Sequence, residues 1–133
     1  MTENEGTLEQ LVVEYVETLN RSKELTMQLE QCKEPKKPTG IVRLEELEQY
    51  KAECAQIAVA RLSIQDQKAL ENKRLKTLQE KIINTIGIKG VWVAAGQYAV
   101  GFYWDIWGGG HFDLEVRPKT DELPPLTDRT YYP

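Results

Sequence analysis

Apolar side chains in the first quarter of the chain recur every three or four residues. The recurring positions are Leu8, Leu11, Val12, Tyr15, Val16, Leu19, Leu25, Leu29 and Cys32. This spacing is typical of one face of an α-helix. Thr7 and Gln10 precede the pattern in the arrangement of a capping box, and Pro35 disfavours helix in the residue before it. We therefore predict a helix over 7–34, with residues 1–6 disordered before it.

The helical spacing resumes after a short interruption. We interpret the stretch at 35–40, which contains two prolines and a glycine, as a tight turn. A second helix is predicted over 41–87, where Gly87 supplies a C-terminal cap. A second potential start signal at Ser63 leaves open whether this helix is continuous or breaks there. The two helices are expected to form a long, coiled-coil-like hairpin.

A tight turn would leave the end of the second helix without a helical neighbour. The first helix would then reach only to about residue 66 of the second. An apolar stripe would continue beyond that point, and a bare stripe of this kind is uncommon on monomeric proteins. We expect self-association, the C-terminal part of the chain, or both, to cover it. The predicted oligomer contacts are Leu70, Leu75, Leu78 and Ile82.

After Gly90 the spacing of apolar residues changes from helical to alternating, which is typical of strands. We predict a three-stranded antiparallel meander within 88–118. Its first turn is a two-residue loop with Gly96 first, and its second is a three-residue loop at 108–110. The fold class predicted for the whole chain is α+β, a helical hairpin followed by this small sheet and an extended, proline-rich tail at 119–133.

The predicted register separates the two faces of the sheet. It places Ala95 opposite Tyr98 and Trp107 opposite His111, and only this alternation keeps one face free of charge. The uncharged face is expected to pack on the helices. Its members are Val91, Val93, Ala95, Tyr98, Val100, Phe102, Trp104, Ile106, Phe112, Leu114 and Val116.

The other face carries the aromatic and charged residues, and we predict that it binds a protein partner. Tryptophan and tyrosine are enriched in the residues that dominate protein interfaces. In the predicted register Gly101 leaves room for Trp92 to stack with Arg117. The predicted partner-binding residues on the sheet are Trp92, Tyr103, Trp107 and Arg117, and those in the tail are Tyr131 and Tyr132. Whether the tail docks on its own chain, reaches a neighbour or is disordered stays open.

The same face suggests a second kind of chemistry. The predicted register sets Asp105 opposite Asp113, a pairing of like charges that destabilises a sheet unless something offsets it. Together with His111 and Glu115 these carboxylates are candidate ligands for a metal ion, or an acid–base pair. The competing interpretation is a solvated strand end, and we assign no metal and no cofactor to the chain.

Composition and charge narrow the classes of function. The net charge of −4 argues against a general nucleic-acid-binding protein. Residues 1–34 hold eight acids and three bases, whereas residues 61–90 hold seven bases and three acids, so oppositely charged segments can pair. No apolar run approaches the ~20 residues that span a bilayer. The two cysteines lie in helical patterns and fit reduced thiols in the cytoplasm, or in a particle assembled there.

The sequence carries no motif of a known catalytic or phosphate-binding loop, and the three consecutive glycines lie between strands rather than before a helix. We therefore expect a non-enzymatic, homo-oligomeric assembly or adaptor protein. A virion structural component and a small inhibitor of a larger machine both fit that class. The alternative is a small metal- or ligand-binding enzyme that uses the four residues of the charged cluster.

Overall fold

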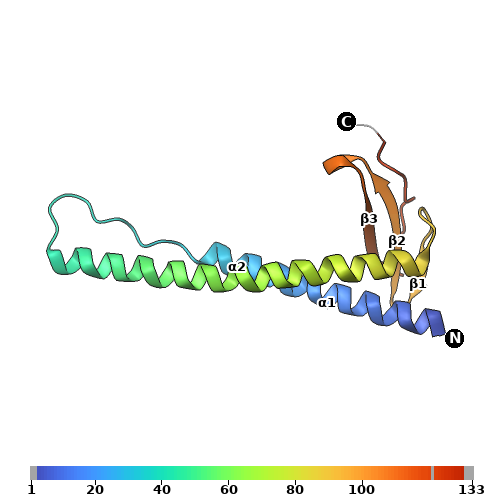
Figure 1. Cartoon of the computed structure of the whole chain (residues 1–133), viewed down its shortest axis with the longest axis horizontal. Coiled ribbons are helices and arrows are strands. Elements are labelled where there is room, and N and C mark those ends of the chain that lie inside the picture. The colour runs from blue at the N-terminus through green and yellow to red at the C-terminus, as the bar shows by residue number, and fades with distance from the viewer. Residues whose placement is uncertain (1–2, 121, 131–133) are drawn as a thin grey trace. The chain divides into compact units, whose positions relative to one another are not determined.

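The structure is a computed structural model that describes residues 3–120 and 122–130. Two long helices are followed by a three-stranded antiparallel sheet of order β1-β2-β3, which confirms the predicted α+β class (Figure 1). The elements are α1 (Glu3–Gln31), α2 (Leu44–Ile86), β1 (Val93–Ala95), β2 (Tyr98–Asp105) and β3 (His111–Pro118).

The chain forms two compact units. The first, here called the sheet module, consists of Met1–Thr18 and Arg74–Pro133. The second, here called the helical module, is Leu19–Lys73. Each module therefore contains part of both helices, and only the sheet module contains strands.

The helix boundaries differ from the prediction at both ends of α1. Residues 3–6 are helical rather than disordered, and α1 ends at Gln31 instead of reaching Glu34. α2 runs through Ser63 without a break. The Ser63 hydroxyl accepts a hydrogen bond from the side chain of Gln67 at 3.5 Å, so it does not serve as a helix cap.

The connection between the helices is extended and is longer than the predicted tight turn at 35–40. It runs beside α2 to the N-terminal end of that helix, where the chain turns and α2 begins (Figure 1). Cys32, Pro35 and Pro38 are half-buried while the residues between them are exposed. A three-residue period is that of a polyproline II helix, which makes no internal hydrogen bonds. Two prolines thus favour an extended segment where the prediction placed a turn.

Arg61 of α2 fixes the point at which α1 ends. Its Nε donates to the Cys32 carbonyl oxygen at 2.8 Å, and a second guanidinium nitrogen donates to the same oxygen. Its Nη1 also lies 3.7 Å from a carboxylate oxygen of Glu34. The last turn of α1 has no basic residue of its own. Arg61 therefore supplies the positive charge that stabilises a helix C-terminus.

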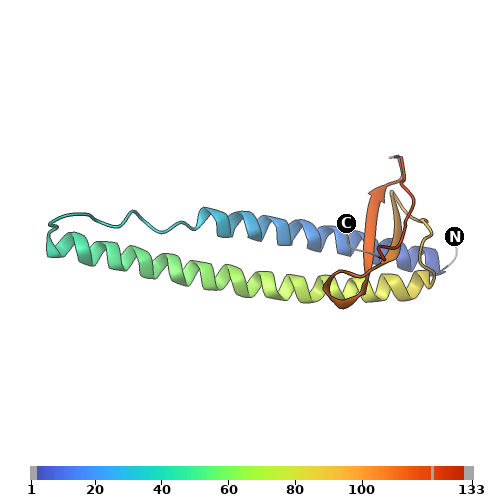
Figure 2. The same cartoon turned by 90° about the horizontal axis from the view of Figure 1, so that it is seen from above.

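The sheet module has an apolar core. Figure 2 shows the sheet crossing α1 and α2 in this module. Part of the uncharged face packs on the helices as predicted, whereas Val91 and Phe112 of that face are exposed. Five buried side chains form the centre of the core. These are Leu8, Val12, Ile82, Ala95 and Val100. Leu78 is 4% exposed and Ile82 is fully buried, so the chain itself covers this part of the predicted oligomer stripe. Leu75 is half-buried, and Leu70, in the helical module, is 69% exposed.

The helical module has almost no apolar core. Within residues 19–73, all of which the structure describes, Leu25 is the single buried hydrophobic side chain. Polar contacts link the helices instead. The Ser22 hydroxyl donates to the Asn72 side chain at 3.1 Å, and Arg21 lies 3.7 Å from the Glu71 carboxylate.

The first hairpin of the sheet has the predicted register, with Ala95 opposite Tyr98. The second is shifted by two residues, because the chain leaves β2 at Asp105 and turns through 106–110, where the left-handed conformation of Gly108 interrupts a short 3₁₀-type turn at Trp107–Gly109. Three successive glycines at 108–110 have φ between 70° and 94°, which only glycine adopts readily. Because the shift is by two residues, every side chain within β2 and β3 keeps its predicted face, whereas Ile106 and Trp107 lie outside the paired strands.

Candidate functional site

The polar cluster lies at the end of the β2–β3 hairpin. Asp105, the last residue of β2, is 4% exposed. One of its carboxylate oxygens accepts a hydrogen bond from the backbone N–H of Trp107 at 3.0 Å. The other lies 3.8 Å from the Arg129 guanidinium. This buried carboxylate therefore holds both the turn and the tail.

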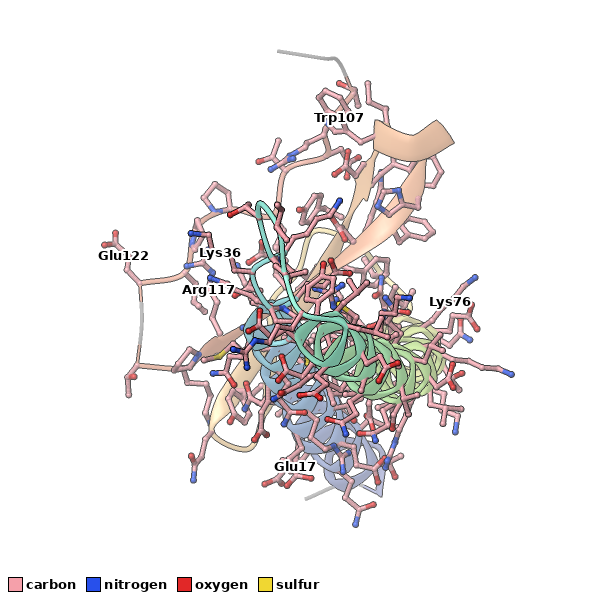
Figure 3. All side chains as sticks on the ribbon, turned by 90° about the vertical axis from the view of Figure 1, so that its left-hand side faces the viewer. Glu17, Lys36, Lys76, Trp107, Arg117 and Glu122 are labelled. Atoms are coloured by element: carbon pink, nitrogen blue, oxygen red, sulfur yellow. The ribbon has the colours of Figure 1, made fainter. Side chains whose placement is uncertain are left out.

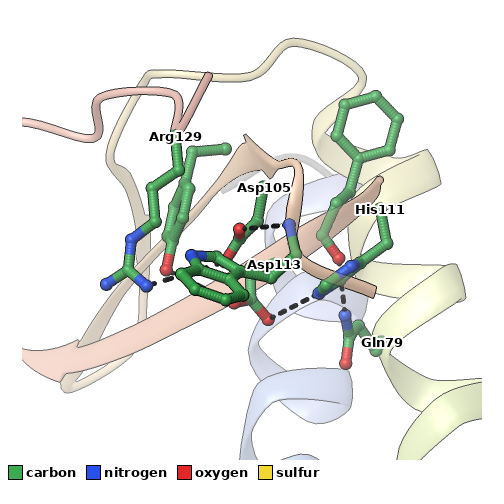
Figure 4. A network of polar contacts seen from close by, with 8 residues as sticks. Gln79, Asp105, His111, Asp113 and Arg129 are labelled. Atoms are coloured by element: carbon green, nitrogen blue, oxygen red, sulfur yellow. Dashed lines mark hydrogen bonds and ion pairs between the residues drawn. The ribbon is translucent and has the colours of Figure 1, made fainter. Parts of the chain in front are cut away.

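The observed register rearranges the predicted carboxylate pair. Asp105 lies opposite His111, and Asp113 lies opposite Tyr103. The like-charge pair across the ladder is therefore absent, and His111 Nε2 lies 3.9 Å from Asp113 (Figure 4). Potential ligand atoms of Asp105, His111 and Asp113 all lie within 4.8 Å of one another. One imidazole and two carboxylates suit a divalent transition metal such as Mn²⁺ or Zn²⁺.

Glu115, the fourth predicted candidate, is not part of this group. Its carboxylate accepts a hydrogen bond from Arg117 at 3.2 Å. Its negative charge contributes to a raised pKa of two tyrosines, Tyr15 and Tyr103. Burial raises the pKa of Tyr15 most, and the carboxylates of Asp113 and Glu115 raise it further. Burial also raises the pKa of Tyr103, followed by Asp113, while Arg129 opposes the change.

The tail at 122–130 lies on the face of the sheet that carries Gly101, Tyr103 and Glu115, here called the outer face. Trp92 Nε1 donates to the carbonyl oxygen of Pro124 at 2.8 Å. The Leu126 side chain fills the space above Gly101, where an added Cβ would come within 2.2 Å of it. Leu126 therefore occupies the position in which Trp92 and Arg117 were predicted to stack.

Two further tail residues bind the backbone at the end of β2, on the edge where β1 pairs only as far as Val100. Asp128 accepts a hydrogen bond from the Trp104 N–H at 2.9 Å and pairs with Lys89. Arg129 exchanges backbone hydrogen bonds with Trp104 and Ile106 at 2.8 and 3.1 Å. The hydrogen bond from Lys89, and then that from Trp104, lower the pKa of Asp128. The tail is thus held by directed bonds along its length.

A groove of about 660 Å³ lies on the other side of the cluster, between α2 and the edge strand β3. Gln79 of α2 donates to the Phe112 carbonyl oxygen at 3.1 Å, so part of this strand's outer edge already has a partner. The Phe112 ring is 40% exposed and packs edge-on against Phe102 and Trp104, with ring centroids 5.3 and 5.1 Å away. The groove therefore has an aromatic wall, Phe112, opposite mostly polar residues of α2.

The predicted partner-binding residues are placed unequally. Trp107 is 43% exposed and lies at the tip of the β2–β3 hairpin (Figure 3). Trp92 binds the tail, and Tyr103 lines the small hollow beneath it. Arg117 is half-buried beside Glu115. Tyr131 and Tyr132 lie outside the described residues.

The sequence patterns did not predict the four residues that bind the edge strand or hold the tail. These are Gln79, Lys89, Asp128 and Arg129. Each acts through one to three bonds to a distant segment, and none belongs to a periodic pattern. The one available signal was charge, since Asp128 and Arg129 interrupt an otherwise apolar and hydroxylated stretch of the tail.

Comparison with protein-family models, with curated proteins and with solved structures finds no match to the chain. Among the described residues, neither helix has a segment apolar and long enough to cross a bilayer.

Proposed function

We propose that the chain is a non-enzymatic assembly or adaptor protein. Its helical module associates with further copies of the chain, and its sheet module contacts a protein partner through the hairpin tip and the adjoining groove.

One observation carries this proposal: several large apolar side chains of the helical module are exposed to water. Leu44, Val59, Leu62 and Leu70 of α2 are 69%, 68%, 60% and 69% exposed. Each buried square ångström of apolar surface contributes roughly 25 cal/mol, and this module buries little. Association would bury Val59 and Leu62, which lie about one turn apart on α2, as well as any exposed apolar side chains beside them.

The sheet module supports the second half of the proposal. Trp107 and Phe112 are both partly exposed and lie on one hairpin, beside a groove large enough to accept a side chain or a short peptide. Exposed aromatic residues on a rigid element are typical anchors of protein interfaces.

Self-association is tested by native mass spectrometry and by sedimentation of the full chain over a range of concentrations. We expect a defined multimer that dissociates on dilution. A chain that stays monomeric at the highest concentration would contradict the assembly function.

A metal-binding function is the second candidate, because three potential ligands converge at Asp105, His111 and Asp113. Both oxygens of Asp105 already have partners, so a metal would have to displace Arg129. Calorimetric titration with Mn²⁺ and with Zn²⁺ tests this candidate. It predicts a one-to-one complex that is lost in His111→Ala and kept in Glu115→Gln. Equal binding by both variants, or none by the wild-type chain, would remove the candidate.

A further inference from the structure

A second face of α2 in the helical module has the same spacing as the face that contacts its own chain. The contacting positions are all half-buried: Leu47, Tyr50, Cys54, Ile57, Arg61, Ile64, Lys68 and Glu71. The second set, here called the outward face, is exposed at every position: Glu48, Ala52, Ala55, Val59, Leu62, Asp66, Ala69 and Lys73. Both sets alternate steps of three and four residues, the spacing by which helices pack along a seam.

The two faces lie on opposite sides of α2. Successive residues are about 100° apart around a helix, so Val59 lies about 200° from Arg61, on the other side of α2. The centre of the outward face carries its largest apolar side chains, Val59 and Leu62, at 68% and 60% exposed. No described residue of this chain buries them.

The outward face is complementary to itself when it is read in reverse. When two copies of this face lie antiparallel about a two-fold axis, Val59 of one copy lies opposite Leu62 of the other. Ala52 then lies opposite Ala69. The same pairing also places Ala55 opposite Asp66, and Glu48 opposite Lys73. A two-fold symmetric interface requires this arrangement, since residue i must contact j while j contacts i.

The charges of α2 favour the same direction. Residues 44–53 hold four acids and one base, whereas residues 68–81 hold five bases and two acids. An antiparallel pair places the acidic start of each helix against the basic part of the other. A parallel pair would place like charges together along the whole contact, which is unfavourable.

We propose that a second copy of this chain docks on the outward face, with the two α2 helices antiparallel and the two-fold axis beside residues 60 and 61. Val59 and Leu62 of the two copies form the centre of the contact, alanines allow close approach on either side, and Glu48 pairs with Lys73 at each end. This inference rests on the proposed self-association and specifies its geometry.

Charge reversal tests the pairing. Glu48→Lys places two positive charges together at both symmetric ends and should weaken the dimer about tenfold, because two attractive contacts become repulsive. Lys73→Glu should weaken it similarly. The double variant, Glu48→Lys with Lys73→Glu, should recover most of the loss. Dissociation constants from analytical ultracentrifugation provide the measurement, with Lys23→Glu on the exposed side of α1 as the matched control.

A strengthening variant guards against misfolding as an explanation. Asp66 is the one charge in the apolar middle of the outward face, and a polar residue at a seam position costs stability. Asp66→Ala should tighten the dimer about fivefold. Circular dichroism of each variant verifies that the helices are retained.

The outcomes separate this inference from the proposed function. A wild-type chain that never associates overturns both. A dimer that neither reversal weakens overturns the antiparallel pairing and leaves self-association in place, because a parallel dimer exchanges one like-charge pair for another. Weakening by Lys23→Glu equal to that by Lys73→Glu would also overturn it. Selective weakening followed by recovery in the double variant supports it.

Discussion

The two modules use the same helices in different ways. In the sheet module, Val12 and Ile82 are fully buried because strands cover the helices. In the helical module, Val59 and Leu62 of the same helix as Ile82 remain exposed. The strands cover the side of α2 that carries Ile82, whereas Val59 and Leu62 lie on the side of this helix that faces away from the chain. The proposed self-association would cover that exposed side.

The largest expected effect contrasts two apolar positions on α2. Ile82→Ala removes a fully buried side chain and should lower the free energy of unfolding by about 2–5 kcal/mol. Leu62→Ala removes one that is 60% exposed and should cost under about 0.5 kcal/mol in the monomer. Urea unfolding followed by circular dichroism, at concentrations where the chain is monomeric, provides the comparison. Equal losses would mean that the helical module has a core comparable to that of the sheet module.

A smaller effect is expected where the tail covers the sheet. Gly101→Ala would bring its Cβ within 2.2 Å of the Leu126 side chain and 2.6 Å of the Val91 carbonyl oxygen. Overpacking of this kind costs about 1–3 kcal/mol. Leu126→Ala should relieve the first clash but not the second, so the double variant should recover part of the loss. Strict additivity of the two variants in a double-mutant cycle would show that Leu126 does not occupy this space.

The smallest effect concerns the charge that holds the tail. Because the pKa of Asp128 is lowered from 3.8, the folded chain favours its ionised form. That contribution is present above the unfolded pKa and is lost as the pH falls through the folded value. Tryptophan fluorescence of the wild type and of Asp128→Asn should differ at neutral pH and converge under acidic conditions. Glu122→Gln, which removes an exposed charge in the same tail, should follow the wild type throughout.

Periodicity predicted the elements better than their connections. The helices and the face of every strand residue follow from spacing, and Gly96 with Gln97 determined the first hairpin. The glycines at 108–110 did not determine the length of the second loop, because Ile106 and Trp107 leave the ladder as well. The spacing of apolar residues also cannot distinguish a tight turn from an extended connection between the helices, because the same two prolines fit both.

The candidate site was predicted as a group of residues rather than as a geometry. Alternation placed Asp105, His111 and Asp113 on one face, and the structure brings them together. The partners of Asp105 depended on the loop length and on Arg129, twenty-four residues away in the chain. Contacts made by single side chains across such separations leave no periodic trace in a sequence.

The docked tail also sets a threshold for any molecule that would use the outer face. A segment tethered this closely to its own site faces it at an effective concentration on the order of millimolar. A free peptide present at about one micromolar is therefore at a roughly thousandfold disadvantage, or ~4 kcal/mol. A competitor that merely copied the contacts of Pro124, Leu126 and Asp128 would not displace them. A partner can therefore reach Trp92 and Gly101 only if it binds them considerably more tightly than the tail does. Alternatively, it can bind the exposed hairpin tip at the same time and gain affinity there.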